Sequence, residues 1–295
     1  MPSIGCYITT IPKTQTVIWV LIIGLFFSCK STYTAYHYQQ LERITIGNGL
    51  TFHPKEELVL ISKPTELKSE NGKPFYRIFQ LKFKDNQWCC ETEVPFSSEF
   101  TDYHPVFSPD GKWLYFNSDR PIPNSEKQPE KINIWRIKYN DGIWDKPEYL
   151  TAINTENHES YPTISNMGTL YFNSDRSGGK GSMDIYKSEN IDGKFLKPIL
   201  VEQLNSKDSE NDMFVDPQVQ FIILNRYLFD TKEIELFISY YKNGKWLKPE
   251  PLTSINETGV WELTPTLSPD GNYLFIEVNG KIKSFPIHQI KNNQK

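Results

Sequence analysis

Residues 105–116 read PVFSPDGKWLYF, and related stretches recur four more times along the chain. Each copy places a short apolar run before a turn and an alternating run after it. The aligned turn positions are separated by 55, 57, 51 and 52 residues. A period of about 50 residues built from short strands is typical of a β-propeller, in which each repeat forms one blade. The other copies are LTFHPKEELVLI (50–61), PTISNMGTLYFN (162–173), MFVDPQVQFIIL (213–224) and PTLSPDGNYLFI (265–276).

The composition of the 295-residue chain also favours strands and tight turns. Only two alanines are present, whereas aromatic residues make up 14% and Pro occurs 20 times. Ala is the best helix former, so this composition argues against a helical bundle. Eight of the 16 glycines follow Asn or Asp, a dipeptide that favours the left-handed turns of β-hairpins. We therefore predict an all-β propeller of five four-stranded blades, with six blades as the alternative.

Each repeat has the same internal order of strands. The first apolar run enters a turn such as Ser108-Pro109-Asp110-Gly111, and a second strand follows. A third strand and a further turn lead to a fourth strand, which is predicted to form the outer edge of the blade. Three copies carry Lys-Pro in this last strand, and Pro is tolerated at a sheet edge. The fourth strands begin with Trp88, Trp144, Phe195 and Trp246.

These motifs resemble the TolB-type, WD40-like propeller repeat of bacterial envelope proteins. The resemblance covers residues 42–290 and rests on the Ser-Pro-Asp-Gly turns, the Asn-Ser-Asp-Arg strand ends, the loop 178–181 and the Lys-Pro strands. Repeats one and four depart from it, because HPKE (53–56) and DPQV (216–219) replace the turn. The resemblance implies a noncatalytic envelope lipoprotein whose propeller binds a protein, a peptide or a cell-wall glycan.

The fifth repeat supplies only three strands before a polar tail, residues 291–295. An unpaired strand edge invites aggregation, so another segment is expected to cover it. Residues 36–46 precede the first repeat and can supply the fourth strand. We therefore predict that an N-terminal strand closes the ring.

An apolar segment at residues 17–28 (VIWVLIIGLFFS) directly precedes Cys29. It has 12 residues, whereas a membrane-spanning helix needs about 20. The end of this segment resembles a bacterial lipobox, which predicts a signal peptide over 1–28, lipidation of Cys29 and a tether over 29–41. The expected location is the bacterial cell envelope, with a lipid anchor in the outer membrane and the propeller facing the periplasm. An uncleaved anchor and a cytosolic protein are the alternatives.

Cys89 and Cys90 are the only cysteines beyond the expected lipid site. Neighbouring residues of a strand point to opposite faces, so packing in the sheet is the expected role of both. A strained vicinal disulfide is the alternative, since an oxidising compartment would permit it.

Four acidic residues stand in register just before the predicted innermost strands, and Gly47 takes their place in the first repeat. Connections into the innermost strand lie at the mouth of the central channel, so the four side chains are expected to converge there. Like charges raise each other's pKa or recruit a cation, which would suit a cationic partner, a sugar or calcium. Alternatively, each acid caps its own turn or pairs with a neighbouring blade. The candidate ligand-binding residues are Asp102, Glu159, Glu210 and Glu262.

Two Asp-Arg pairs end the second strands of repeats two and three: Asp119 with Arg120, and Asp175 with Arg176. Their repetition in register predicts structural bridges between blades. The glycine-rich loop 178–181 is expected to be a hairpin connection and not a phosphate cradle, because no helix follows to add its dipole.

Two function classes remain, a binding module and a glycan-active enzyme with carboxylates at the channel mouth. The five histidines lack metal-ligand spacing, and no Gly-x-Ser-x-Gly nucleophile motif occurs. We therefore expect no catalytic residue, no metal and no cofactor, with calcium left open. The net charge of −4 argues against a nucleic-acid partner. The expected partners of this monomer are an envelope protein or a cell-wall glycan, and the membrane through the lipid anchor.

Overall fold

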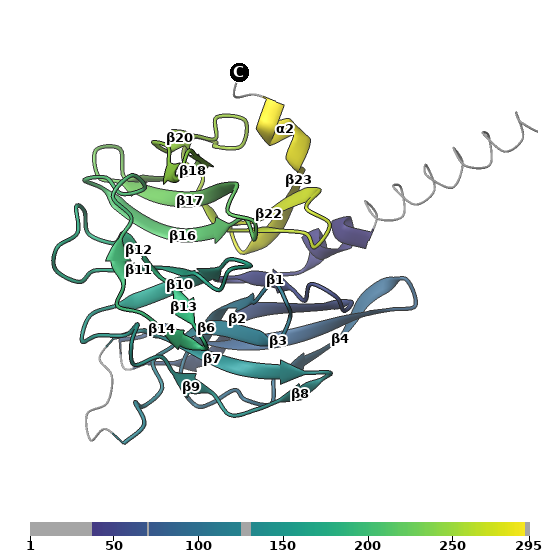
Figure 1. Ribbon diagram of the computed structural model, residues 1–295. Helices are drawn as coiled ribbons and strands as arrows, with labels where there is room; N and C mark the ends of the chain where they lie inside the picture. The colour runs from purple at the N-terminus through teal and green to yellow at the C-terminus, as the bar shows by residue number, and fades with distance from the viewer. Residues whose placement is uncertain (1–36, 70, 125–130, 293–295) are drawn as a thin grey trace, which may run out of the picture.

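The computed structural model describes residues 37–69, 71–124 and 131–292, which form five blades of antiparallel strands (Figure 1). The predicted signal peptide and Cys29 lie outside the described residues. Within the described ranges, no helix has the length and apolar character that crossing a membrane requires. The five-bladed, all-β propeller predicted from the repeats is thus confirmed.

The strands follow the repeats in chain order. Blade 1 contains β1 (Leu50–Phe52), β2 (Leu58–Lys68), β3 (Pro74–Lys84) and β4 (Gln87–Glu93). Blade 2 contains β5 (Asp102–Phe107), β6 (Trp113–Ser118), β7 (Asn133–Asn140), β8 (Ile143–Trp144) and β9 (Glu148–Tyr149). Blade 3 contains β10 (Glu159–Ile164), β11 (Leu170–Ser174), β12 (Asp184–Ser188) and β15 (Ile199–Leu200), with a small hairpin of β13 (Asn190–Ile191) and β14 (Lys194–Phe195).

The last two blades complete the ring. Blade 4 contains β16 (Ser209–Val215), β17 (Phe221–Leu228), β18 (Glu233–Lys242), β19 (Lys245–Trp246) and β20 (Glu250–Pro251). Blade 5 contains β21 (Glu262–Leu267), β22 (Tyr273–Val278) and β23 (Lys281–Pro286), and α2 (Ile287–Asn292) follows it. The first strands contact one another in the order β1, β5, β10, β16, β21 and back to β1, so they surround the central channel.

The apolar core is divided into five clusters, each lying between two neighbouring blades. Strand β6 shows how one strand serves two clusters. Leu114 and Phe116 face blade 1, whereas Tyr115 faces blade 3, because successive side chains of a strand point to opposite faces. Since both faces of this strand are covered, its sequence is a continuous apolar run. Each buried apolar side chain contributes about 1.5–3 kcal/mol to the free energy of folding.

The turn Ser108-Pro109-Asp110-Gly111 between β5 and β6 is held by its own side chains. The Ser108 hydroxyl donates to Asp110 Oδ1 at 2.6 Å and accepts the Trp113 N–H at 2.9 Å. Gly111 has φ of 79°, and a Cβ there would meet the His53 ring. In repeat one, His53 Nδ1 accepts the N–H groups of Lys55 and Glu56, so a histidine replaces the serine and the departing sequence still folds into a blade.

The outer strands are interrupted wherever Lys-Pro occurs. In blade 2, β8 and β9 flank Lys146-Pro147 and pair with different parts of β7. Blade 4 repeats this arrangement with β19 and β20 against β18. Pro lacks the N–H that a ladder needs, so each predicted fourth strand becomes two short pieces. In blade 1, the fourth strand β4 (QWCCETE) contains no Lys-Pro and runs unbroken over 7 residues.

The N-terminal segment closes the ring, but as a helical turn and not as the predicted strand. Residues 37–39 are helical and continue into η1 (Gln40–Arg43). Among residues 37–46, only Thr45 pairs with blade 5, through an isolated bridge to Lys281. The run QQLER (39–43) consists of strong helix formers without a β-branched residue, which explains the difference.

This helical turn joins the last blade to the first. Leu41 is fully buried, and the Tyr38 ring packs against Phe52 of blade 1 and Phe275 of blade 5. The Trp88 indole N–H on β4 donates to the His37 carbonyl at 3.1 Å. The closing contact is therefore made mainly by side chains and extends from blade 5 to the outer edge of blade 1.

Cys89 and Cys90 lie on β4, and Cys90 is exposed while Cys89 is half-buried. The expected packing role of both residues is therefore wrong. The reason is that β4 is an outer edge strand with an irregular register, so neither side chain reaches an apolar cluster.

Candidate functional site

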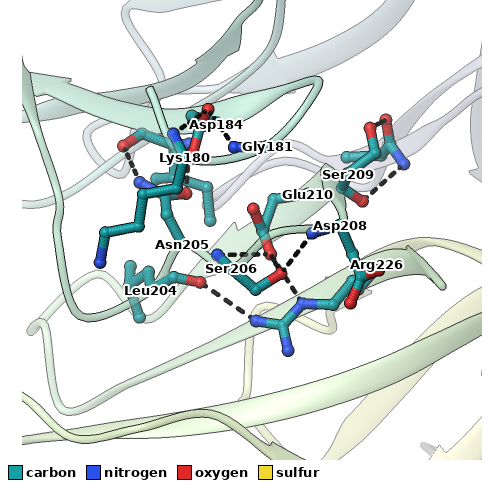
Figure 2. A network of polar contacts seen from close by, with 12 residues as sticks. Lys180, Gly181, Asp184, Leu204, Asn205, Ser206, Asp208, Ser209, Glu210 and Arg226 are labelled. Carbon is teal, nitrogen blue, oxygen red and sulfur yellow. Dashed lines mark hydrogen bonds and ion pairs between the residues drawn. The ribbon is translucent and has the colours of Figure 1, made fainter. Parts of the chain in front are cut away.

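The four acids predicted from their register are buried where their innermost strands begin, and none is more than 2% exposed. Glu210 on β16 represents the arrangement (Figure 2). Its Oε1 accepts the Ser206 N–H at 3.1 Å, the Ser206 hydroxyl at 2.6 Å and Arg226 Nε at 2.7 Å. Arg226 also donates to the Leu204 carbonyl at 3.2 Å. The carboxylate thus ties the incoming loop to the second strand of its own blade.

Two other acids repeat this pattern. Asp102 accepts from the Ser98 N–H and hydroxyl and from Arg120 Nη2, the last at 2.7 Å. Glu159 accepts from the Thr155 N–H and hydroxyl and from Arg176 Nη2, the last at 3.0 Å. Each acid therefore caps the backbone four residues upstream and forms a buried ion pair within its blade.

Glu262 keeps the cap but lacks the arginine. Its Oε1 accepts the Glu257 N–H at 3.1 Å. The position that corresponds to Arg120 is Gly280, which with Asn279 forms the tight turn between β22 and β23, both in left-handed backbone conformations. Burial raises the pKa of Glu262.

In these contacts, each of the four acids caps the backbone of the turn before its own strand. Burial raises the pKa of Glu210 despite the opposing effect of Ser206 and Arg226. None of the four carboxylates lines either of the two pockets described below. A ligand-binding role for the four acids stays a prediction.

The residues of the two Asp-Arg pairs make structural contacts within their own blades, whereas bridges between blades were expected. Arg120 and Arg176 pair with the acids that begin the innermost strand of the same blade. Asp119 and Asp175 instead accept backbone N–H groups, from Thr101 and His158 respectively, both at 2.8 Å. The prediction of bridges between blades is therefore wrong, because each arginine pairs with an acid on the neighbouring strand of its own blade.

The glycine-rich loop 178–181 connects β11 to β12, as expected of a hairpin connection. Asp184 Oδ2 accepts the N–H groups of Lys180 and Gly181 at 2.9 and 3.1 Å (Figure 2). A Cβ on Gly181 would collide with the Asp208 carbonyl. Gly179 and Gly181 therefore permit close approach of the backbone, and the Asp184 carboxylate occupies the N–H groups of Lys180 and Gly181.

A pocket of about 400 Å³ opens at the end of the channel where the innermost strands begin. We call it the Trp261 pocket. Trp261 and Phe229 are 50% and 45% exposed, respectively, and belong to its lining together with Tyr161 and Tyr227. Asp212 is the one acid among its described lining residues. The pocket therefore combines aromatic faces with a single carboxyl group.

Asp212 lies on β16, two residues after Glu210, and is 3% exposed. Its Oδ2 accepts the Thr264 N–H and the Asn225 side-chain amide, both at 3.1 Å. Asp212 Oδ1 and Asn225 Oδ1 are buried acceptors without a hydrogen-bond partner among the described residues. Burial, with a smaller effect of Glu277, raises the pKa of Asp212 to about 7.

Asp212 belongs to a channel-lining column that sequence reasoning missed. The column follows the acids by two residues, and its other members in blades 2, 3 and 5 have left-handed backbones at β-bulges. The bulges turn these side chains away from the regular alternation. The regular spacing was visible in the sequence, but the residue types differ, so no chemical pattern marked the column. Its members are His104, Tyr161, Asp212 and Thr264.

A second pocket, of about 490 Å³, lies at the other end of the innermost strands. The Ser-Pro-Asp-Gly turns and their counterparts in other blades line it, and His104 and Thr264 reach it from the channel. Among the described residues, no three His, Cys, Asp or Glu side chains are grouped so as to hold a metal ion. The two pockets are therefore distinguished by the exposed aromatic side chains and the Asp212 carboxyl group that line the Trp261 pocket.

The chain matches no protein-family model and no curated protein sequence. Solved structures do resemble it. A TolB structure from Agrobacterium tumefaciens is 20% identical, with a TM-score of 0.53, over 81% of this chain and 75% of that one. An endo-arabinase from Bacteroides thetaiotaomicron is 11% identical, with a TM-score of 0.55, over 83% of this chain and 95% of that one.

An α-L-arabinofuranosidase from Lactobacillus brevis is also similar, at 11% identity and a TM-score of 0.53, over 82% of this chain and 91% of that one. At such identities the likeness concerns the fold alone, because one fold carries many functions. The protein is a five-bladed β-propeller whose fold is similar to that of the solved TolB structure.

Proposed function

We propose that the protein is a noncatalytic lipoprotein of the bacterial envelope that binds a protein, peptide or cell-wall glycan partner in the Trp261 pocket. The observation that carries this proposal is the buried Asp212 Oδ1, which has no hydrogen-bond partner among the described residues, at a pocket whose rim exposes Trp261 and Phe229. Buried polar atoms are normally hydrogen-bonded, so an exception in a pocket needs an explanation. A ligand group that fills the pocket would supply the partner.

The chemistry of the pocket defines what this group must offer. When Asp212 is ionised, its Oδ1 and Asn225 Oδ1 are both acceptors, so the ligand must present hydrogen-bond donors. Hydroxyl groups of a sugar and the amino or guanidinium group of a peptide meet this requirement. The faces of Tyr227 and Trp261 suit the apolar face of a sugar ring or a cationic group. A donor-rich group held between aromatic rings is thus the expected ligand.

The proposed location rests on the N-terminal sequence. The apolar segment 17–28 and Cys29 resemble a lipoprotein signal, and a propeller tethered through residues 29–41 could reach partners in the periplasm. The solved TolB structure supports a binding role only by likeness of fold.

A glycan-active enzyme is the second candidate, and Asp212 is the observation in its favour. Its raised pKa would leave the carboxyl group partly protonated near neutral pH, as a general acid requires. Glycoside hydrolysis, however, uses two carboxyl groups about 5–9.5 Å apart, and Asp212 is the one acid in the described lining of the pocket. Release of reducing sugar from cell-wall polysaccharide by the wild type, but not by Asp212→Asn, would replace the binding proposal.

The binding proposal is tested with three forms of the protein on beads: the wild type, Trp261→Ala and Ile143→Ala. Ile143 is 69% exposed on β8 of blade 2 and lies outside both pockets, so its replacement is the matched control. Solubilised envelope proteins and muropeptides are passed over each form, and the bound material is identified by mass spectrometry.

We expect the same ligand on the wild type and on Ile143→Ala, and at least a tenfold loss on Trp261→Ala. A factor of ten corresponds to about 1.4 kcal/mol, which is typical of truncating an aromatic anchor. Equal retention by Trp261→Ala and the wild type, or no ligand retained by the wild type, would contradict the proposed site.

A further inference from the structure

Strand β4 contains a β-bulge at its two adjacent cysteines. Lys82 of β3 pairs with Cys89, but Gln80 pairs with Thr92, so two residues of β4 stand opposite one residue of β3. Cys90 takes up the extra length with a left-handed backbone, at φ of 61°. A bulge of this kind redirects side chains away from the regular alternation.

The bulge brings the two sulfur atoms together. In a regular strand, the side chains of neighbouring residues point to opposite faces. Here Cys89 Sγ and Cys90 Sγ are 2.7 Å apart. Cys90 is exposed and Cys89 is half-buried, so dissolved reagents can reach the pair. Two thiols in contact, accessible and held by the backbone form a site for chemistry, whereas a packing role would need both to be buried.

We propose that Cys89 and Cys90 form a redox site that closes to a vicinal disulfide with disulfide oxidants and reopens with thiol reductants. One thiolate attacks an oxidant R–S–S–R, which forms a mixed disulfide and releases one R–S⁻. The second cysteine, as its thiolate, attacks the protein sulfur of the mixed disulfide and releases the second R–S⁻. The protein loses two protons and two electrons, and the oxidant is reduced to two thiols.

The covalent structure explains why this disulfide should reopen readily. Adjacent Cα atoms across a trans peptide are about 3.8 Å apart, whereas most disulfides join Cα atoms about 4.4–6.8 Å apart. Departure from the preferred geometry makes a disulfide easier to reduce, and exposed or strained disulfides belong to the labile class. The bulge offsets part of the cost of this unfavourable disulfide geometry, because the folded backbone already holds the two sulfur atoms in contact.

The environment of the thiols sets the direction of the pH dependence. The hydrogen bond with Cys90 raises the pKa of the Cys89 thiol, and burial acts in the same direction. Lys84 opposes this shift and Asp85 adds to it, and both are near neighbours on the same hairpin. Because the thiolate is the attacking form, closure should become faster as the pH rises.

The test uses the purified full chain at a series of ratios of oxidised to reduced glutathione. Free thiols are then blocked with iodoacetamide, and the chain is cleaved after Lys and Arg. Residues 85–112 form one peptide that contains Cys89 and Cys90 and no other cysteine, so its mass reports this pair alone. The reduced pair carries two blocking groups, and the closed pair carries none and lacks two hydrogen atoms.

We expect the peptide to pass directly from doubly blocked to closed. Closure should need at least tenfold less oxidised glutathione in the folded chain than in the chain unfolded in concentrated urea, because only the bulge holds the sulfur atoms in contact. The Cys90→Ser variant should stop at the glutathione adduct on Cys89. A folded chain that stays doubly blocked at every ratio, accumulates glutathione on both cysteines, or closes only in urea would overturn the proposal.

Discussion

His104 Nδ1 lies 3.9 Å from Asp212 Oδ1 across the central channel. The two residues come from β5 and β16, which belong to blades 2 and 4 and are separated in the ring by blade 3. Neither atom has a hydrogen-bond partner among the described residues. Two titratable side chains thus meet where the innermost strands converge, and their burial shifts the two pKa values in opposite senses.

The first prediction concerns the pH dependence of stability. Burial raises the pKa of Asp212 to about 7 and lowers the pKa of His104 to about 3. Buried Asp212 keeps a proton that the unfolded chain releases above about pH 4, so its contribution to stability is lost as the pH rises towards 7. His104 stays neutral when the unfolded chain takes up a proton below about pH 6.5, so its contribution is lost as the pH falls.

Between about pH 4 and 6.5 these two slopes, each about 1.4 kcal/mol per pH unit, should nearly cancel in the wild type. Asp212→Asn keeps only the histidine slope of this pair, so relative to the wild type its free energy of unfolding should fall by about 3 kcal/mol as the pH falls over this range. In His104→Asn, it should instead fall as the pH rises. Urea unfolding at several pH values measures both slopes.

The neighbouring charges are the same in both variants. Glu277 is the other acid that raises the pKa of Asp212, and burial raises the pKa of Tyr103 and Tyr161, which keeps both rings neutral. His288→Asn, at an exposed position on α2, is the control and should leave the wild-type profile unchanged. Parallel profiles for all variants would show that His104 and Asp212 titrate as they do in the unfolded chain.

The second prediction separates capping from ion pairing in the acidic column. Glu210→Gln leaves Arg226 buried without its carboxylate and should lower the free energy of unfolding by about 3 kcal/mol. Glu262→Gln removes only the charge at a cap without an arginine and should cost about 1 kcal/mol. Urea unfolding of the two variants and of the double variant gives the comparison.

The effects should add in the double variant, because the two acids cap different blades and share no partner. A double variant that is clearly more stable than the sum, together with a calcium-dependent rise in stability of the wild type alone, would indicate that the acids share one ligand site. Capping alone would then not explain the stability effects of these acids.

The third prediction tests the closing segment. Leu41→Ala should lower the free energy of unfolding by about 2–5 kcal/mol, because Leu41 is fully buried between blade 5 and blade 1. Leu67→Ala is the matched control, since Leu67 is 63% exposed on β2, and it should change stability by less than about 0.5 kcal/mol. Urea unfolding followed by tryptophan fluorescence measures both.

Deleting residues 36–46 extends this test to the whole contact and should lower the melting temperature by many degrees. Exposed blade edges invite pairing between molecules, so size-exclusion chromatography is run on the same sample. An unchanged melt of a monomer would mean that another segment seals blade 5.

The fourth prediction concerns the N-terminus. Cells that express the wild type and are fed an alkyne analogue of palmitate should yield labelled protein, because the apolar segment 17–28 directly precedes Cys29. Cys29→Ser should lose the label, whereas Cys6→Ser, which alters a cysteine upstream of that segment, should retain it. Equal labelling of wild type and Cys29→Ser would place the lipid elsewhere.

The blade architecture could be predicted from the sequence because it depends on local patterns. Strand alternation, the turn at Ser108-Pro109-Asp110-Gly111 and the spacing of the repeats each act over a few residues and recur. Even the departing turn at His53 connects its two strands, since the His53 side chain accepts backbone N–H groups of its own turn. Because these local patterns recur in every repeat, the number of repeats predicted the number of blades.

The site and the closing contact depended on tertiary structure, because they join residues that are far apart along the chain. The sequence marked Glu210 by register, but only packing showed that Arg226 occupies its carboxylate. It could not show that bulges bring His104 and Asp212 together across the channel or Cys89 against Cys90. Local alternation determines which residues belong to a strand, whereas departures from alternation and contacts across the ring determine which side chains meet.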